Sequence, residues 1–172
     1  MPDQITQHLM MIRPVAFSKN KETSINNYFQ FDTELTTALI QTKALQEFDD
    51  FVQKLRKVSI EVYVFEDTQD PSTPDSIFPN NWISFHQNGS LILYPMFANN
   101  RRLERRSDLI DALGSDFKIT EVFEDLLSFE SHHKFLEGTG SLVLDRVNHI
   151  AYASSSDRTK REVILAIVKL TA

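Results

Sequence analysis

Two neighbouring amides, Asn80 and Asn81, stand between a proline and the only tryptophan of the chain in the segment SIFPNNWISFH. Large apolar residues flank the pair, because Phe78 precedes it and Trp82 follows it. An amide both donates and accepts hydrogen bonds. Amides among apolar side chains therefore indicate either a turn with satisfied polar groups or a pocket that binds a polar ligand, and the residues alone leave both open.

A carboxylate enters a glycine-flanked turn in the segment FLEGTGS, where Glu137 precedes Gly138 and Gly140. Glycine lets the backbone pack closely against a ligand or against another loop. The plainer interpretation is a hairpin turn with an exposed Glu137, and composition alone favours it. The segment lacks the pattern of a phosphate-binding P-loop.

Hydroxyl groups and a cation meet in the segment SSSDRT, where Arg158 follows Asp157 at the expected end of a strand and start of a helix. Such a helix terminus with an arginine can bind a carboxylate. Simple capping of the helix by Ser156 or Asp157 is the alternative that the residues alone favour. A serine nucleophile working with His149 is disfavoured, because the chain has no GxSxG elbow.

Four arginines fall within six positions of the segment NNRRLERR. Because a glutamate interrupts them and the net charge of the chain is −6, a solvated helix face is favoured over a set of phosphate contacts. The five histidines show no metal-ligand spacing. We therefore predict no metal site, no cofactor and no nucleic-acid partner.

The composition is that of a globular protein, with 172 residues, 41% hydrophobic and 24% charged. No apolar run is long enough to span a bilayer and the first residues lack a signal-peptide pattern, so we expect a cytoplasmic protein without a membrane partner. The chain contains no cysteine, which excludes disulfides, thiolate metal ligands and a cysteine nucleophile within it.

Periodicity predicts the elements that must position these residues. The order is strand, helix, strand, hairpin, helix, strand, hairpin, helix, an α/β pattern with a recurring strand–strand–helix–strand unit. The apolar run at 163–168 needs neighbours on more than one side, so we expect the chain to be part of a longer protein. The expected elements are strands at 8–12, 58–65 and 118–122, helices at 35–55, 102–113 and 158–170, a hairpin of 82–86 with 91–94, and a hairpin of 142–144 with 149–153.

Several segments together resemble one family: IRP, FPNNW, LYPMFANNRRLERR, FLEGTGSLVLDR and SSSDRT. They are similar to the N-terminal half of bacterial arginine deiminase-related, amidinotransferase-like proteins, close to the citrulline utilisation hydrolase group of the guanidine-modifying superfamily. The resemblance covers essentially the whole chain, and FPNNW and FLEGTG are its more specific segments. It implies the pentein fold, an α/β propeller of five ββαβ blades, of which residues 1–172 would supply two to three as a single N-terminal portion.

The resemblance also implies a mechanism. In this superfamily a cysteine attacks the guanidinium or ureido carbon, a histidine transfers protons, and a carboxylate orients the histidine. Glu137 matches the carboxylate, whereas the cysteine and the histidine lie in the C-terminal half of the relatives. The chain alone is therefore expected to be inactive. Relatives often carry an aspartate where this chain has Gly140, so any contact made by that acidic group is missing.

The resemblance assigns substrate-binding roles as well. Asn81, with Asn80 beside it, stands where arginine deiminases carry an aspartate that pairs with the guanidinium. An amide removes that charge interaction and suits a neutral ureido group such as that of citrulline. Phe78 and Trp82 would flank the planar group, and Arg158 would hold the substrate α-carboxylate as a bidentate clamp.

The expected function is thus hydrolysis of a carbon–nitrogen bond in a citrulline- or arginine-like amino acid, with the missing C-terminal half or a partner chain completing the site. An amidinotransferase is an open alternative, because hydrolases and transferases of this superfamily share the covalent step. Further alternatives are a non-catalytic module that binds an amino acid or a protein, and a degenerate fragment whose apolar surface drives self-association. A homo-oligomer is left open.

Overall fold

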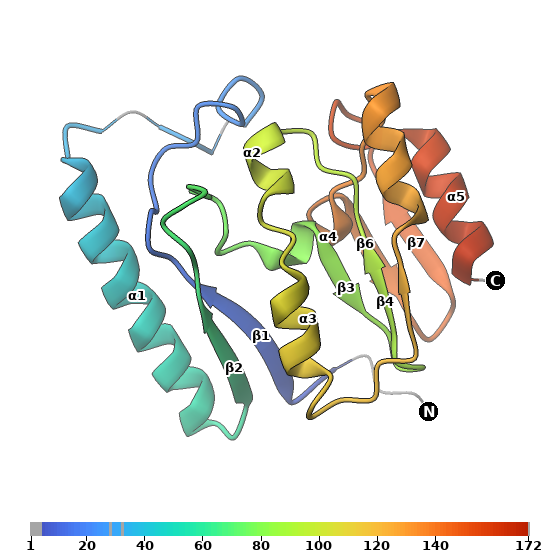
Figure 1. The fold of residues 1–172 in the computed structure, drawn as a ribbon, viewed down its shortest axis with the longest axis horizontal. Helices are drawn as coiled ribbons and strands as arrows, with labels where there is room; N and C mark the ends of the chain where they lie inside the picture. Colours follow the sequence, from blue (N-terminus) through green and yellow to red (C-terminus); the bar gives the residue numbers. More distant parts are fainter. Residues whose placement is uncertain (1–4, 28, 32, 172) are drawn as a thin grey trace. The chain divides into compact units, whose positions relative to one another are not determined.

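The structure is a computed structural model, and it describes residues 5–27, 29–31 and 33–171 (Figure 1). The chain divides into two compact units, one of residues 5–79 and one that begins at Asn80. Each unit is described by itself below.

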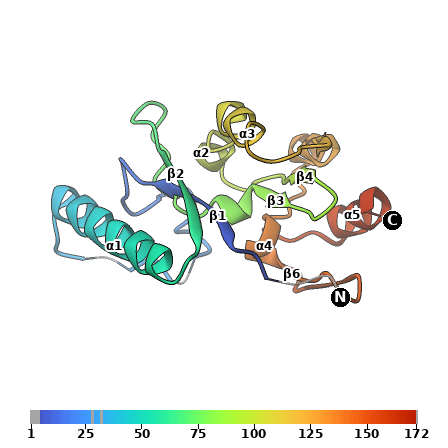
Figure 2. The same ribbon diagram turned by 90° about the horizontal axis from the view of Figure 1, so that it is seen from below.

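The first unit is a strand–helix–strand arrangement with a parallel pair of strands. The long helix lies beside the two-stranded sheet (Figures 1 and 2), and Ile12, Val52 and Val62 are buried. The predicted helix and first strand are confirmed, but the second strand starts later than predicted, because Val58 caps the helix and Ser59 has a positive φ of 65°. The elements are β1 (His8–Arg13), α1 (Thr37–Lys57) and β2 (Glu61–Glu66).

The second unit begins with a complete ββαβ arrangement, as the sequence predicts. Its three-stranded sheet has the order β3-β4-β5, with β3 antiparallel and β5 parallel to β4. One face carries α3, and α4 with β6 lies on the other (Figures 1 and 2). The elements are β3 (Ile83–Phe85), β4 (Ser90–Leu93), α2 (Asn99–Arg102), α3 (Ser107–Leu113) and β5 (Glu121–Phe123).

The expected single helix at 102–113 is wrong, because the chain breaks between α2 and α3. The solvated arginine face is wrong too. Arg101 is only 2% exposed and pairs with Glu104, and Arg105 pairs with Glu130. Glu130 lies far along the chain, so the spacing within NNRRLERR contains no sign of it. The predicted strand at 118–122 is shifted toward the C-terminus, to β5.

A second antiparallel hairpin and a helix complete the described part of the second unit. The predicted hairpin is confirmed, and the final helix begins at Arg161 rather than at residue 158. The core of this unit is a cluster of Ile92, Tyr94, Leu126, Leu136, Leu142, Val163 and Ile167. The elements are the 3-10 helix η2 (Asp125–His132), α4 (Gly138–Ser141), β6 (Leu142–Asp145), β7 (Ile150–Ala153) and α5 (Arg161–Thr171).

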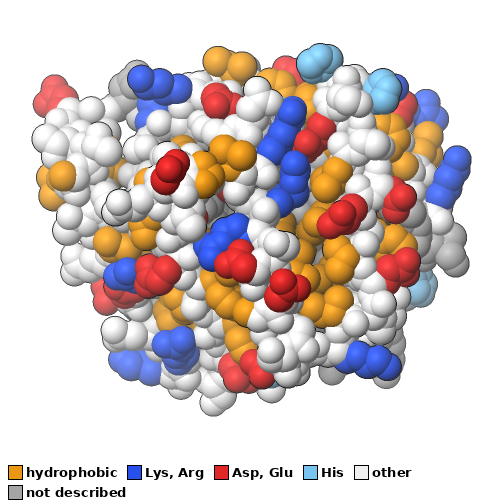
Figure 3. Space-filling model, viewed as in Figure 1, with side chains coloured by type: hydrophobic (Ala, Val, Ile, Leu, Met, Phe, Trp, Pro, Cys, Tyr) orange, Lys and Arg blue, Asp and Glu red, His pale blue; other side chains and the backbone are white. Residues whose placement is uncertain are grey.

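Acidic and basic side chains alternate across the face seen in Figure 3, with apolar side chains between them. Among the helices that the structure describes, none combines the length and the apolar character that a membrane crossing needs.

Candidate active site

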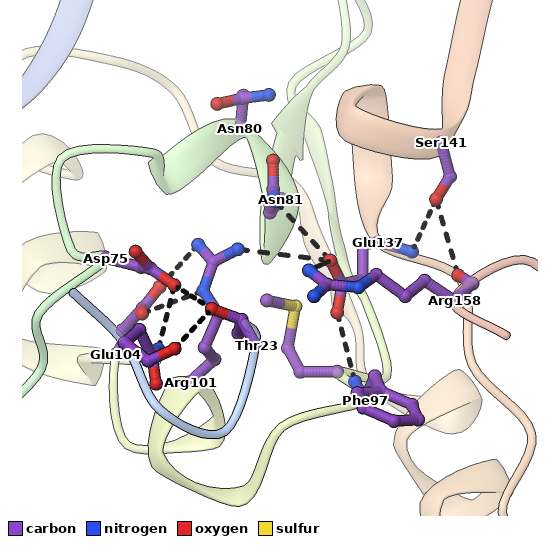
Figure 4. A network of polar contacts seen from close by, with 12 residues as sticks. Thr23, Asp75, Asn80, Asn81, Phe97, Arg101, Glu104, Glu137, Ser141 and Arg158 are labelled. Carbon is purple, nitrogen blue, oxygen red and sulfur yellow. Dashed lines mark hydrogen bonds and ion pairs between the residues drawn. The ribbon is translucent and has the colours of Figure 1, made fainter. Parts of the chain in front are cut away.

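Glu137 is buried, not exposed as the plainer interpretation of its turn predicts. Only 2% of this residue is exposed to solvent. The backbone N–H of Phe97 donates to Oε1 at 3.1 Å, and Nδ2 of Asn81 donates to Oε2 at 3.5 Å (Figure 4). Because an unpaired carboxylate in such a place would be strongly destabilising, these donors and the nearby cations explain how the protein tolerates it.

Two arginines approach the same carboxylate. Nη1 of Arg158 lies 3.4 Å from Oε2 of Glu137, and Nη1 of Arg101 lies 3.9 Å from it. Arg101 is itself held by Glu104 through two hydrogen bonds of 2.9 Å. Two guanidinium groups and two carboxylates thus lie close together here, and the fork-like pairing with Glu104 fixes the position of Arg101.

Glycines let the turn that carries Glu137 lie directly against the Asn80–Asn81 backbone. Gly138 has a φ of 40°, and a methyl group on its Cα would overlap the carbonyl oxygen of Asn80. At Gly140 a Cβ would lie 2.6 Å from Oδ1 of Asn81. The hydroxyl of Thr139 donates to the Asn80 carbonyl at 3.4 Å. The two conspicuous segments of the sequence, PNN and EGTG, are therefore in contact.

Hydroxyl groups connect the Arg158 segment to the same turn. Oγ of Ser141 accepts the N–H of Glu137 at 3.3 Å and lies 3.3 Å from the carbonyl oxygen of Arg158, to which it donates. Thr159 donates to this Ser141 hydroxyl at 2.8 Å. The Ser156 hydroxyl accepts the N–H of Arg158 within a turn that precedes α5, so Arg158 does not lie in the first turn of the helix as predicted.

A stack of cations and aromatic rings holds the arginine side chain. The guanidinium of Arg158 lies 5.7 Å from the ring centroid of Phe97, which meets Phe135 edge-on at 5.4 Å. The guanidinium of Arg102 lies 5.7 Å from the ring centroid of Phe135. Such contacts stabilise a desolvated guanidinium. Phe97 is thus a site residue that the sequence analysis did not single out, and Arg101 is one that it assigned to a solvated helix face.

The other predicted site residues are less closely associated with Glu137. Asn80 is exposed, and its side chain points away from Glu137 in Figure 4. Trp82 is 1% exposed and lines a cavity of about 160 Å³ whose other lining residues include Arg105 and Ile110 but neither Asn81 nor Glu137. Phe78 belongs to the first unit. The substrate-flanking roles of Phe78 and Trp82 stay predictions.

A separate polar network joins the two hairpins of the second unit. Nη1 of Arg146 donates to Nδ1 of His86 at 3.1 Å, so the ring carries its proton on Nε2, which lies 2.9 Å from Oγ of Ser84. The Ser84 hydroxyl in turn lies 2.7 Å from that of Tyr94. Burial, together with the charge of Arg146, lowers the pKa of His86 to about 4. Because His86 donates to Ser84, it does not activate this serine as a nucleophile.

Within the described ranges, no group of three or more His, Cys, Asp or Glu side chains could hold a metal ion. The contacts described above are made by a carboxylate, amides and guanidinium groups. Such groups bind and orient a polar, planar ligand and can position a proton-transferring residue.

The family model described as "N,N dimethylarginine dimethylhydrolase, eukaryotic" matches residues 13–171. The chain belongs to this family. Its resemblance to the guanidine-modifying superfamily is thereby confirmed. No curated protein sequence matches the chain.

Solved structures of dimethylarginine dimethylaminohydrolase have the same fold as this family member. The enzyme from Pseudomonas aeruginosa, complexed with citrulline, has a TM-score of 0.63 at 14% identity over 95% of this chain and 55% of its own. A second structure is an adduct of dimethylarginine dimethylaminohydrolase with S-methyl-L-thiocitrulline. It has a TM-score of 0.63 at 14% identity, over 95% of this chain and 56% of its own. The predicted pentein-type α/β fold is confirmed by these likenesses.

A related likeness extends to the N-terminal domain of ArgZ, an arginine dihydrolase from the ornithine–ammonia cycle in cyanobacteria. Its product-bound structure has a TM-score of 0.62 at 16% identity, over 94% of this chain and 53% of that chain. The chain thus spans about half the length of these three solved chains. At such low identity the likeness concerns the fold alone.

Proposed function

We propose that the chain forms the carboxylate-bearing part of the active site of a hydrolase that cleaves a carbon–nitrogen bond of a ureido or guanidino amino acid. One observation carries the proposal. Glu137 is buried, and both of its oxygens receive donors, from the Phe97 N–H, the Asn81 amide and Arg158. Membership of the dimethylarginine hydrolase family supports the reaction class.

In this proposal the nucleophile and the proton-transferring histidine come from outside the chain. The sequence contains no cysteine, and the chain spans only about half the length of the dimethylarginine dimethylaminohydrolase chains that share its fold. The complementing part is either a continuation of the same polypeptide or a partner chain. The cysteine thiolate attacks the ureido or guanidino carbon, the histidine protonates the departing nitrogen, and water then releases the product from sulfur.

Glu137 orients that histidine by accepting an N–H from its ring. A carboxylate offers about four lone-pair directions. The hydrogen bonds from Phe97 and Asn81 and the approach of Arg158 fix its plane. A fixed carboxylate holds an imidazole in one tautomer and one orientation, which is what efficient proton transfer requires.

Asn81 selects a neutral ureido group over a guanidinium cation. Its amide lies next to Glu137, so an aspartate there would set two carboxylates against each other at about the 3.5 Å of the present hydrogen bond. The amide oxygen accepts a ureido N–H without adding charge. Arg158 holds the α-carboxylate of the substrate by bidentate hydrogen bonds, with the Phe97 ring supporting its guanidinium.

The test uses the complete enzyme, with the complementing part present, and measures release of amine and ammonia from citrulline and from arginine. We expect citrulline to be hydrolysed with the higher kcat/KM. Glu137→Gln should lower kcat by about 10²- to 10⁴-fold, since it removes the acceptor that orients the histidine. Hydrolysis of neither compound by the complete enzyme would refute the proposal.

Selectivity is tested with a matched pair of variants. Asn81→Asp should shift the ratio of kcat/KM values toward arginine by about tenfold or more, because it adds a charge that pairs with a guanidinium. Asn80→Asp adds the same charge one position earlier, on an exposed residue whose side chain points away from Glu137. It should leave the ratio unchanged. An equal loss for both substrates in the first variant would show that Asn81 supports Glu137 rather than substrate choice.

A further inference from the structure

Residues 94–97 follow β4 and belong to neither a helix nor a strand. Tyr94 is 1% exposed and Met96 is fully buried. Backbone polar groups in such a place need hydrogen-bond partners. The Pro95 carbonyl accepts the Leu136 N–H at 3.1 Å. The other carbonyl groups of the segment, and the Met96 N–H, are bound by charged side chains.

Two arginines bind the carbonyl groups of this segment. Nη1 of Arg105 donates to the carbonyl oxygen of Tyr94 at 3.2 Å. Arg102 donates from Nε to the carbonyl oxygen of Met96 at 3.0 Å and from Nη2 to that of Phe97 at 3.3 Å. A guanidinium group presents its donors in a rigid planar fork, so each arginine fixes the direction of the carbonyl groups that it binds.

Glu130 binds both arginines and the same segment. Its Oε1 accepts the Met96 N–H at 2.8 Å and Nη1 of Arg105 at 2.6 Å. Its Oε2 accepts Nη2 of Arg105 at 3.1 Å and lies 3.5 Å from Nε of Arg102. The side chain comes from η2 and is 13% exposed. Bidentate, charge-assisted hydrogen bonds of this kind are stronger than neutral ones. We name Glu130, Arg102 and Arg105 the Glu130 cluster.

The peptide group between Met96 and Phe97 connects the Glu130 cluster to Glu137. Its carbonyl accepts Nε of Arg102, and its N–H donates to Oε1 of Glu137 at 3.1 Å (Figure 4). Because a peptide group is planar, a carbonyl held on one side fixes the direction of the N–H on the other. Glu130 binds the preceding N–H, that of Met96. The Phe97 N–H therefore cannot turn away from Glu137 without breaking contacts of the Glu130 cluster.

We propose that Glu130 is a positioning residue of the active site. It keeps the Phe97 N–H on Glu137, and thereby keeps that carboxylate in the plane that orients the histidine. The inference rests on the proposed function for the role of Glu137. If Glu130 only balanced the charges of its two arginines, it would affect stability and not the rate of the chemical step. Its contact with the Met96 N–H, next to the N–H that binds Glu137, is the observation that points to the site.

The first test is Glu130→Gln in the complete enzyme. The new amide can still accept the Met96 N–H, but its NH2 group faces the donors of the arginines, so the segment loosens. We expect kcat to fall about 10- to 100-fold, which is the effect that a small misplacement of a reacting group can have. KM should change little, because the groups proposed to bind the substrate, Asn81 and Arg158, stay in place. An unchanged kcat would overturn the proposal.

A double variant shows whether Glu130 acts through Glu137. Once Glu137→Gln has removed the carboxylate, there is nothing left for Glu130 to position. Adding Glu130→Gln to that variant should therefore lower kcat by no more than about twofold. Losses that multiply in full would show that Glu130 supports activity by another route and would overturn the proposal.

Hydrogen exchange gives a readout that does not depend on activity. In the complete enzyme with isotope-labelled phenylalanine and tyrosine, NMR follows the N–H of Phe97 and that of Tyr94, which donates to the Trp82 carbonyl at 2.9 Å. Glu130→Gln should speed exchange of the Phe97 N–H at least about tenfold and leave the Tyr94 N–H unchanged. An unchanged rate at Phe97, or an equal increase at both positions, would overturn the proposal.

Asp108→Asn is the matched control. Asp108 pairs with Arg106 at the same two distances, 2.6 and 3.1 Å, as Glu130 does with Arg105, but it is mostly exposed. The variant should leave both kcat and the exchange at Phe97 unchanged. Effects as large as those of Glu130→Gln would show that the loss of any such ion pair disturbs the unit, and would overturn the proposal.

A second variant covers the case in which Glu130→Gln does not fold, as reported by the fluorescence of Trp82, the only tryptophan. Arg102→Met removes both donors to the segment at a side chain that is a quarter exposed, and it should change kcat and the exchange at Phe97 in the same direction. No change in either would again overturn the proposal.

The proposed function and the positioning role can fail separately. If neither citrulline nor arginine is hydrolysed while Glu130→Gln still speeds exchange at Phe97, the proposed function fails and the coupling between Glu130 and Glu137 stands. If the enzyme is active and Glu130→Gln leaves kcat unchanged, the positioning role alone is removed.

Discussion

The two hairpins of the second unit are alike in plan and opposite in environment. Each has a four-residue loop that ends in a residue of positive φ, Gly89 at 86° in the first and His149 at 55° in the second. The central pair of β3–β4 is almost completely buried, whereas the central pair of β6–β7 is more than half exposed. Within the described residues, the central pair of the first hairpin is thus covered and that of the second is not.

This difference in burial matters for the site, because each hairpin follows one of its two conspicuous segments. Asn81 lies just before β3, and Glu137 lies just before α4 and β6. The buried hairpin therefore supports the segment that carries Asn81, and the open hairpin leads away from Glu137, the carboxylate that we propose orients the histidine. Predictions that act on the hairpins separate these two roles.

The largest effect is expected for removing the buried anchor. Ile92→Ala should lower the free energy of unfolding by about 2–5 kcal/mol, since it leaves a cavity in the core cluster. The matched change on the open hairpin, Tyr152→Ala, should cost less than about 1 kcal/mol. Chemical denaturation followed by Trp82 fluorescence measures both. Equal losses would mean that the exposed hairpin is packed in solution against something the chain itself provides.

A smaller loss is expected at the contact that joins the starts of the two hairpins. Gly138→Ala combines a positive φ with an overlap onto the Asn80 carbonyl and should cost about 1–3 kcal/mol. Gly114→Ala is its control, because Gly114 has an ordinary φ of −60° and ends α3. That variant should change stability by less than about 1 kcal/mol in either direction. The same denaturation experiment distinguishes them, and a neutral Gly138→Ala would contradict the close approach of the two loops.

Much of this architecture was predictable from local patterns. The alternation at 58–65, the helical spacing at 35–55 and the apolar runs of the hairpin at 82–86 and 91–94 each depend on neighbours in sequence, and the elements they predict are present, with the strand shortened to Glu61–Glu66. The segments PNN and EGTG were recognised as conspicuous for the right reason, since glycines do allow a close approach.

The predictions that were wrong concern residues whose partners lie far away in the sequence. The arginines of NNRRLERR look like a solvated face because Glu130 and Glu137, which bind or approach them, lie far along the chain. Glu137 looks exposed because its donors, the Phe97 N–H and the Asn81 amide, belong to other loops. The apolar character of Tyr152 and Ile92 likewise does not say which one is covered, because cover is a property of the tertiary packing.

Acid should weaken the contact between His86 and Arg146 that joins the two hairpins. The pKa of His86 is about 4 in the folded protein and near 6.5 when unfolded, because burial and Arg146 disfavour its charged form. The unfolded chain therefore binds an extra proton between these values, so stability is full above pH 6.5 and falls as the pH drops toward 4. We expect a loss of about 1–3 kcal/mol, discounted for partial solvent access.

The variant His86→Gln isolates this titration. It keeps a donor and an acceptor but cannot be protonated in this range. The slope of stability against pH between 4 and 6.5 should flatten in the variant, with Trp82 fluorescence again as the probe. A slope that persists unchanged between these pH values would assign the acid sensitivity to groups other than His86.

The smallest effect concerns the loops themselves. His149 holds a left-handed conformation that Gly89 adopts in the other hairpin without steric cost. His149→Gly should therefore stabilise the second unit by about 0.5 kcal/mol, the strain of a side chain at positive φ less the greater freedom of glycine in the unfolded chain. Gly89→Ala should do the reverse and more strongly, because its Cβ would lie 2.5 Å from the Lys118 carbonyl oxygen. Destabilisation by His149→Gly would mean that the imidazole makes contacts that stabilise the fold by more than the strain of its positive φ.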